Sequence, residues 1–446
     1  MFENLGFESL LVLWIVCTVL NGLYILQRDR TSGLTVVYLV RLWMFYWVGG
    51  ALHYWAMQIG MDGYLIRGTQ MTEIGLGKSL IALSAFSLAN VATVYHQSQE
   101  ERGSVIEVSR GDDKEQIYKL IFVGVLSFAV LTVAAGLPTI TSFLDAGREL
   151  ISVGLCALAW LYLKKENTTG VLICAAISIA APLLTAGLFG FMGVGAAVSI
   201  TVIIFVLVNV RKRVAALTIG VCMLYLSLSL FVSYAGKRQS IRSSVWGDND
   251  AGQGLVKTSR LVTEGSAFNP YDVQHLQFID WRLNQSYLVG EAVSHTSRTN
   301  EYAQGETITT AVSALIPRVI WPDKPIKLGG TEMASEYTGL RFAASGVSIG
   351  IGKVFEFYIN YGDAGIVVGY LLFGIVVGYL DVRSANALQR RRWLGFAQWF
   401  LPGLMFLKVM GPLHELSVRL VAAFVLAYVL KHVLGDRLAR RKCKLS

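Results

Sequence analysis

Five basic residues lie in a polar stretch in the last third of the chain, and their chemistry suits a phosphate ligand. They are Arg282, Arg318, Lys324, Lys327 and Arg341. An arginine guanidinium is a planar fork that binds two phosphate oxygens at once, whereas a lysine ammonium supplies a point charge. We therefore predict a cationic pocket for a diphosphate, with the three arginines as ligands and Lys324 in support. Ordinary ion pairs with nearby carboxylates are the alternative for any single cation.

The segment 316–325, Ile-Pro-Arg-Val-Ile-Trp-Pro-Asp-Lys-Pro, carries two of these cations and three of the eight prolines of the chain. Proline fixes φ and is excluded from helix interiors, so this backbone is expected to be rigid, extended and irregular. Rigid irregular backbone inside an otherwise apolar protein usually lines a polar cavity. The segment therefore marks the centre of the predicted pocket.

Two residues are candidates for proton transfer at this pocket, Glu356 and His414. Glu356 lies between two phenylalanines, where desolvation would raise the pKa of the carboxyl group toward the working range of a base. His414 is the second candidate, although a histidine in a short turn is more often an ordinary polar residue. Tyr358 and Arg419 complete the predicted substrate-binding residues, with Arg419 facing the same outer cavity as His414.

Several catalytic motifs are absent from the sequence. No His-Glu-x-x-His or Walker pattern occurs. These absences argue against metal-assisted hydrolysis of the zinc-protease type and against nucleotide use. Four of the five cysteines lie in apolar runs, without the spacing of a metal site or a disulfide framework. We predict neither a metal nor a cofactor.

The elements that must position these residues are membrane spans. Hydrophobic residues make up 54% of the 446 residues and charged residues only 15%, against about 25% charged residues in a soluble domain. A span needs about 20 mostly apolar residues. The predicted fold is therefore an all-α polytopic membrane protein with eleven spans. They are 8–27, 33–57, 75–96, 117–136, 149–163, 169–187, 192–210, 214–234, 364–381, 394–411 and 416–433.

The net charge of +9 sits mainly in alternate short connections and in the tail, so it indicates orientation and not nucleic-acid binding. Basic pairs or triplets occur at residues 28–30, 102–114, 164–165, 211–213 and 390–392, and the tail after 436 is basic. By the positive-inside rule the N-terminus lies outside and the C-terminus in the cytoplasm. Arg67, Lys78 and Arg148 are exceptions in the outer connections. Arg41, inside the second span, either faces a cavity or reaches back to the cytoplasmic interface.

This topology divides the chain into an N-terminal bundle of eight spans (1–235), a large outer segment (236–363) and three C-terminal spans with the tail (364–446). In the outer segment, residues 273–293 show apolar residues at helical spacing. The glycine-punctuated stretch 346–363 predicts a short re-entrant or interfacial helix before the ninth span. Gly374 and Gly378, four residues apart in that span, predict close helix packing.

Three passages of the sequence resemble a known family. Arg282-Leu-Asn-Gln-Ser-Tyr, the proline-rich segment 316–325 and Phe355-Glu-Phe-Tyr-Ile-Asn-Tyr-Gly-Asp-Ala-Gly are similar to the large loop and following span of Wzy-type O-antigen or exopolysaccharide polymerases. The resemblance covers about the last 170 residues in motif and the whole chain in topology. It implies a GT-C-like polymerase or ligase architecture in a bacterial inner membrane, with a periplasmic N-terminus.

The resemblance also implies an activity. The expected reaction transfers a glycan from undecaprenyl pyrophosphate to a lipid-linked repeat unit at the periplasmic face, without a metal. The implied partners are these lipid-linked oligosaccharides and membrane lipids, and docking of a chain-length regulator is left open. Two other functions remain: an O-antigen ligase-type transferase that uses lipid A core as acceptor, and a flippase or transporter for the lipid-linked repeat. A flippase would carry polar residues through its spans, whereas here they concentrate in one outer segment.

Overall fold

The computed structural model describes residues 5–27, 31–65, 67–100, 113–133, 138–210, 213–246, 251–316, 321, 328–342 and 349–445. Within these residues the regular secondary structure is helical, and the one extended pairing is an isolated bridge between Gly352 and Met410. The chain folds as two compact units. Unit 1 comprises Met1–Asp113, Val123–Arg148 and Asp280–Ser446, and unit 2 comprises Lys114–Phe122 and Glu149–Ile279.

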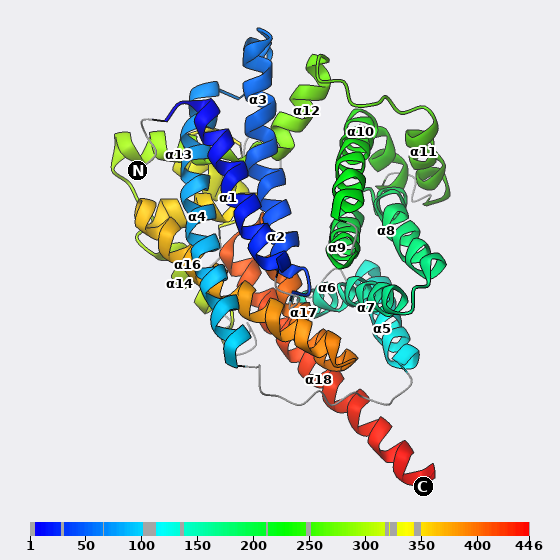
Figure 1. Cartoon of the computed structure of the whole chain (residues 1–446). Coiled ribbons are helices and arrows are strands. Elements are labelled where there is room, and N and C mark those ends of the chain that lie inside the picture. The colour runs from blue at the N-terminus through cyan, green and yellow to red at the C-terminus, as the bar shows by residue number, and fades with distance from the viewer. Residues whose placement is uncertain are drawn as a thin grey trace. The chain divides into compact units, whose positions relative to one another are not determined.

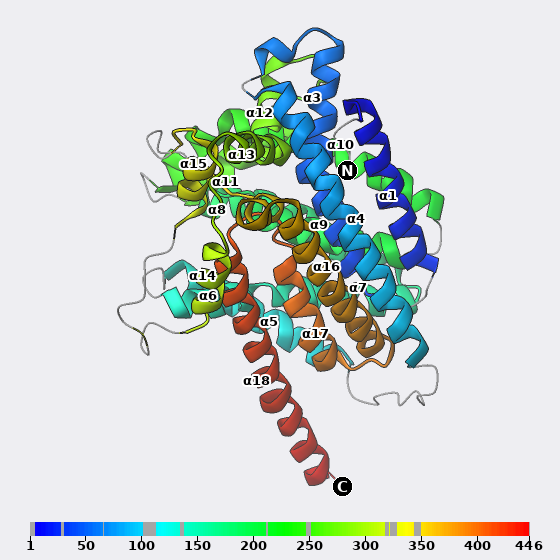
Figure 2. The same cartoon turned by 90° about the vertical axis from the view of Figure 1, so that its left-hand side faces the viewer.

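Unit 1 contains both the first and the last helices of the chain. Its elements are α1 (Phe7–Gln27), α2 (Leu34–Leu42), the π-helical turn η1 (Trp43–Trp47), α3 (Val48–Gln58), the 3-10 turn η2 (Asp62–Tyr64), α4 (Thr69–Glu100), α6 (Pro138–Arg148), α13 (Gln285–Thr299), α14 (Glu306–Ser313), α15 (Gly330–Thr338), α16 (Lys353–Gln389), α17 (Trp393–Phe406) and α18 (Leu413–Leu445). Helices α4 and α16 run side by side in both ribbon views (Figures 1 and 2).

Unit 2 holds most of the middle of the chain. Its elements are α7 (Leu150–Lys164), α8 (Thr168–Phe189), α9 (Gly193–Asn209), α10 (Arg213–Trp246) and α11 (Ala251–Thr263). Two further helices, α5 (Asp113–Val133) and α12 (Val273–Leu283), contribute residues to both units. Within unit 2, α8 packs against α7, α9 and α11.

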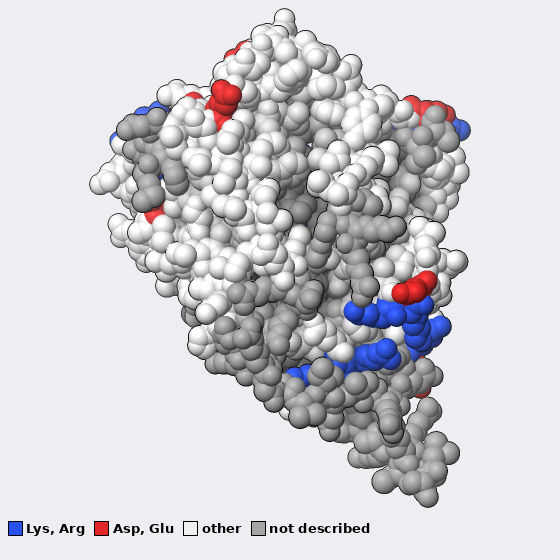
Figure 3. Space-filling model, in the orientation of Figure 1, with Lys and Arg blue, Asp and Glu red and all other residues white. Residues whose placement is uncertain are grey.

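Eight helical stretches are long and apolar enough to cross a membrane, judged by length and composition over the described residues. They are Phe7–Gln27, Leu34–Gln58, Thr69–Gln97, Ile140–Lys164, Thr168–Phe189, Ala216–Trp246, Lys353–Gln389 and Leu413–Val433. Large apolar side chains such as Leu20, Leu172 and Leu217 are more than half exposed. Most of the described surface that faces the viewer in Figure 3 carries no charged side chain. These features define an all-α polytopic membrane protein.

The other three predicted runs lie on helices outside that set of eight. Run 117–136 lies on α5, run 192–210 on α9 and run 394–411 on α17. Helix α9 has 17 residues and α17 has 14, so α17 is about 21 Å long, shorter than the apolar core of a bilayer. The sequence overestimated α17 because the apolar run continues to Met410, whereas the helix stops at Phe406.

Two predictions about α16 agree with the structure. The helix begins at Lys353 and is interrupted at Tyr361 and Gly362, where Gly362 has φ 59°, so a short helix precedes the long one as predicted for 346–363. Gly374 and Gly378 face α4, where a Cβ at either position would press on Phe86 or Asn90. Their lack of a side chain therefore allows α16 and α4 to approach closely.

Candidate functional site

The short connection between α17 and α18, residues 407–412, is irregular backbone between two apolar helices. Its Gly411 N–H donates to the Ile351 carbonyl at 2.8 Å, beside the bridge between Gly352 and Met410. The connection is therefore hydrogen-bonded to the segment that leads into α16. Non-helical backbone at such a place is tolerated only against protein or water, so its polar groups need partners.

Three buried charged side chains supply some of those partners. Arg41 Nη1 donates to the Leu407 carbonyl at 2.8 Å, and the Lys353 ammonium donates to the Gly411 carbonyl. Glu356 Oε2 accepts the Leu413 N–H at 2.6 Å, at the first residue of α18. Arg41 therefore binds the C-terminal end of α17 instead of reaching back to the cytoplasmic interface, while Glu356 caps the N-terminus of α18.

A second group of charges surrounds Asp145 near the end of α6. Its carboxylate contacts Lys408 Nζ at 2.7 Å, Arg148 Nη2 at 2.5 Å and Arg419 Nε at 3.1 Å. Arg419 also contacts Glu415 at 3.4 Å. One carboxylate thus contacts three cations.

The two groups form one network, because Lys353 interacts electrostatically with Glu356, Glu415 and Arg419. We call these eight side chains the connection network. It consists of Arg41, Arg148, Lys353, Lys408, Arg419, Asp145, Glu356 and Glu415. Five of these side chains are cations and three are carboxylates. The side chains of Lys408 and Arg419 are 22% and 28% exposed, so these two can meet a ligand from outside. Such a site suits an anion with several oxygens.

Three of the residues predicted from the sequence contact or belong to the first two turns of α18. Glu356 binds Leu413, His414 is the next residue, and Arg419 lies farther along the same helix. Glu356 is fully buried, and its second oxygen, Oε1, meets no hydrogen-bond partner among the described residues. His414 is partly exposed.

Tyr358 belongs to a different cluster at the kink of α16. The Lys78 ammonium lies 5.8 Å from the centre of its ring and contacts Asp363 at 3.0 Å. The Tyr302 ring is 6.3 Å away, centre to centre, and itself partly exposed. Tyr358 therefore lies beside the ion pair of Lys78 and Asp363, and its described contacts do not include the connection network.

The remaining predicted ligands are not brought into the network by the described contacts. Arg282, in the last turn of α12, and Arg341, after α15, are both exposed. Arg318 and Lys324 lie outside the described residues, so their role as ligands stays a prediction. Asp280, one of the carboxylates near Arg282 in the sequence, binds His53 and Asn284.

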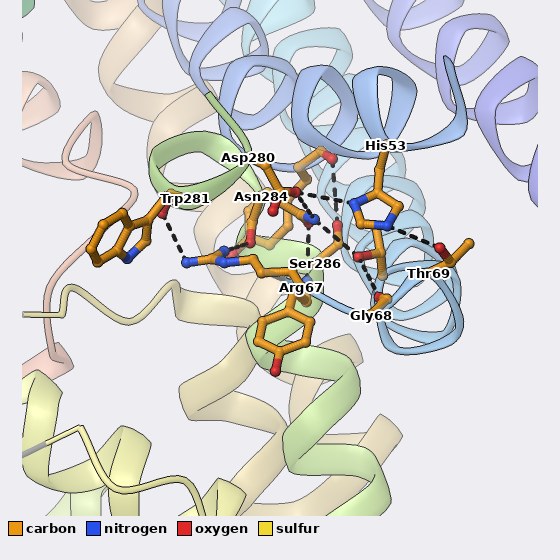
Figure 4. A network of polar contacts seen from close by, with 11 residues as sticks. His53, Arg67, Gly68, Thr69, Asp280, Trp281, Asn284 and Ser286 are labelled. Carbon is orange, nitrogen blue, oxygen red and sulfur yellow. Dashed lines mark hydrogen bonds and ion pairs between the residues drawn. The ribbon is translucent and has the colours of Figure 1, made fainter. Parts of the chain in front are cut away.

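A buried polar network joins the end of α12 to α3 and α4 (Figure 4). His53 lies between Asp280 and Thr69, while Asn284 donates to Asp280 at 2.7 Å and to Thr72 at 2.9 Å. Arg67 donates to the carbonyls of Trp281, at 2.8 Å, and Asn284. Burial lowers the pKa of Arg67, and the negative charge of Asp280 acts in the opposite direction.

Sequence reasoning did not single out Lys353, Lys408, Asp145 or His53. A signal was present for Lys408, because an ionisable residue inside an apolar run is costly unless it faces a polar interior. Arg67, Lys78 and Arg148 gave another signal as cations that break the charge alternation. Among the described residues, no group of three or more His, Cys, Asp and Glu side chains is arranged to hold a metal ion.

Fold and site together define a polytopic membrane protein with charged clusters in its helix connections. Within that class, the chain belongs to the family described as domain of unknown function DUF8712, which matches residues 37–435. No curated protein and no solved structure matches the chain.

Proposed function

We propose that this protein is a membrane glycosyltransferase of the polymerase type. It transfers a glycan from undecaprenyl pyrophosphate to a lipid-linked repeat unit at the periplasmic face of the bacterial inner membrane. The observation that carries the proposal is the group of five cations in the connection network, with Lys408 and Arg419 partly exposed. The resemblance to Wzy-type polymerases supports the same substrate, because a lipid diphosphate is what these cations suit.

The proposed orientation is consistent with this site. With the N-terminus outside, the ends of α6 and α17 and the starts of α16 and α18 all lie on the outer side. The eleven-span, GT-C-like architecture requires α5, α9 and α17 to count as spans beside the eight apolar helices. The charges then gather at one side of the membrane, which favours a transferase over a flippase that carries its substrate across.

The reaction needs charge stabilisation more than covalent help. A hydroxyl oxygen of the acceptor sugar forms a bond with the anomeric carbon of the donor, and the bond from that carbon to the diphosphate oxygen breaks. Lys408 and Arg419, with Arg148 behind them, offset the charge that grows on the departing diphosphate. One well-placed group of this kind contributes about 3 kcal/mol. Glu356 Oε1 is our first candidate for the hydroxyl proton and His414 the second.

Incubating the purified protein with lipid-linked repeat units tests the proposal. We expect a ladder of lengthened glycans without added nucleotide sugar. If glycan appears on lipid A core and not on repeat units, the protein is a ligase. Absence of any transfer, together with movement of the intact lipid across vesicle membranes, would show that the transferase proposal is wrong.

Replacing Arg419 tests the site itself. We expect Arg419→Ala to lower the rate of elongation about 100-fold, in line with the loss of one group that stabilises developing charge, and Arg419→Lys to recover part of it. Arg298→Ala is the matched control, since Arg298 is an exposed cation at the end of α13 that is not part of the network. Equal elongation by Arg419→Ala and the control would remove Arg419 from the site.

A further inference from the structure

The buried network of Figure 4 contains an aspartate, a histidine and a hydroxyl in line. Asp280 Oδ1 lies 3.1 Å from His53 Nδ1, and His53 Nε2 lies 3.0 Å from Thr69 Oγ1. Asp280 comes from the last turn of α12, His53 from α3 and Thr69 from the first residue of α4. A carboxylate that orients a histidine, which in turn contacts a hydroxyl, is the arrangement that activates a nucleophile.

The hydrogen bonds around Asp280 fix the direction of proton donation. Asp280 Oδ1 also accepts from Asn284 Nδ2 at 2.7 Å, so this oxygen already acts as an acceptor. In the same role toward the imidazole it accepts from His53 Nδ1, which then carries the proton. His53 Nε2 is then the acceptor, and the Thr69 hydroxyl donates to it.

Of the three residues, Thr69 is the one that is partly exposed. His53 and Asp280 are 0% and 2% exposed, whereas Thr69 is partly exposed. Thr69 opens α4, whose first N–H groups have no intrahelical acceptor and whose dipole favours a negative oxygen. A buried dyad therefore ends at a residue that is partly exposed.

This site is separate from the connection network. His53 follows Arg41 by twelve residues along the continuous helical stretch α2–η1–α3, which corresponds to about 18 Å.

We propose that Thr69 is an activated nucleophile that accepts an acyl group from an ester at the outer membrane surface. Thr69 Oγ forms a bond with the ester carbonyl carbon as its proton passes to His53 Nε2. The bond from that carbon to the alcohol oxygen then breaks, and His53 returns the proton to the departing alcohol. Attack by water or a sugar hydroxyl on the acyl-threonine repeats these steps and restores Thr69. Thr69 and His53 are the catalytic residues, and Asp280 is a positioning residue.

Covalent labelling of the purified full-length protein tests this directly. The wild type is treated with a fluorophosphonate probe and, separately, with a short-chain nitrophenyl ester, and adducts are located by peptide mass spectrometry. We expect one adduct on Thr69 and a burst of nitrophenol of about one equivalent. A wild type without an adduct on Thr69 overturns the proposal, whatever the variants do.

Variants then separate chemistry from folding. We expect Thr69→Val to abolish the adduct, Thr69→Ser to retain it, and His53→Gln and Asp280→Asn each to slow it at least about 100-fold. Thr309→Ala, which removes an exposed hydroxyl on α14, should label as the wild type does. Each variant is first shown to elute and melt as the wild type does. Labelling of Thr69 at the full rate in folded His53→Gln would overturn activation by the dyad. We expect the variants that lose labelling still to form the glycan ladder. The labelling assay and the ladder assay therefore test this proposal and the proposed glycan transfer independently.

Discussion

At the scale of single residues, the informative cations are those that depart from the orientation pattern. Arg67, Lys78 and Arg148 break the predicted alternation of charge between connections, and each has a buried or partly buried partner. Pairing offers a physical reason for cations at these places. A cation that departs from the predicted orientation pattern is therefore a signal that a sequence alone can supply.

The ion-pair partners of such cations could not be predicted from the sequence. Lys78 pairs with Asp363, 285 residues later, and Lys408 with Asp145, 263 residues earlier. No local pattern relates such pairs, because they depend on how the helices pack. Burial of Glu356 between two phenylalanines was readable locally, but its contact with Leu413 required the structure.

Glu356 offers a residue-scale test that separates two roles. Glu356→Gln keeps a carbonyl oxygen to accept the Leu413 N–H, so we expect the helix cap and the melting temperature to be nearly retained. It removes the group that takes a proton, so elongation should fall at least about 100-fold. Glu356→Ala loses both functions and should also cost about 1 kcal/mol of stability from the lost cap. Normal elongation by folded Glu356→Gln would reduce Glu356 to a structural cap.

At the scale of elements, helical periodicity predicted where helices occur better than it predicted where they begin and end. The pattern over 273–293 predicted one helical stretch, and its apolar residues Leu276, Ile279 and Leu283 are indeed buried. The chain nevertheless breaks at Asn284, whose side chain accepts the Tyr287 N–H and donates to Thr72 and Asp280. A break that serves long-range polar contacts leaves the periodicity almost unchanged.

Helix α13 depends on glycine contacts with α4, and this gives a second test. A Cβ at Gly290 would overlap the Met71 carbonyl, and a Cβ at Gly75 would overlap the Ser286 carbonyl. We expect Gly290→Ala to destabilise the protein by about 3 kcal/mol, because backbone must move, and to lower its melting temperature in detergent. Gly22→Ala in α1 is the control, since its Cβ meets nothing within 4 Å, and it should leave stability equal or slightly higher. Equal melting of the two variants would contradict the close packing of α13 on α4.

At the scale of the whole molecule, composition predicted the class and left the arrangement open. An apolar, weakly charged chain indicated an all-α polytopic membrane protein, which the structure confirms, because run length and charge report directly on transfer into a bilayer. The compact units were less predictable. Unit 1 combines the first helices with the last, and this depends on contacts between segments far apart in sequence.

Orientation is the remaining whole-molecule prediction, and cysteine labelling tests it. In a variant without the five native cysteines, Thr309→Cys on α14 should react with an impermeant maleimide added to intact spheroplasts, because residues 236–363 are predicted to lie outside. Lys165→Cys, in the exposed connection after α7, should react only after the membrane is permeabilised. Both positions are exposed in the structure, so a difference between them reports sidedness and not burial. The reverse pattern would place the connection network on the cytoplasmic side, where a periplasmic polymerase could not use it.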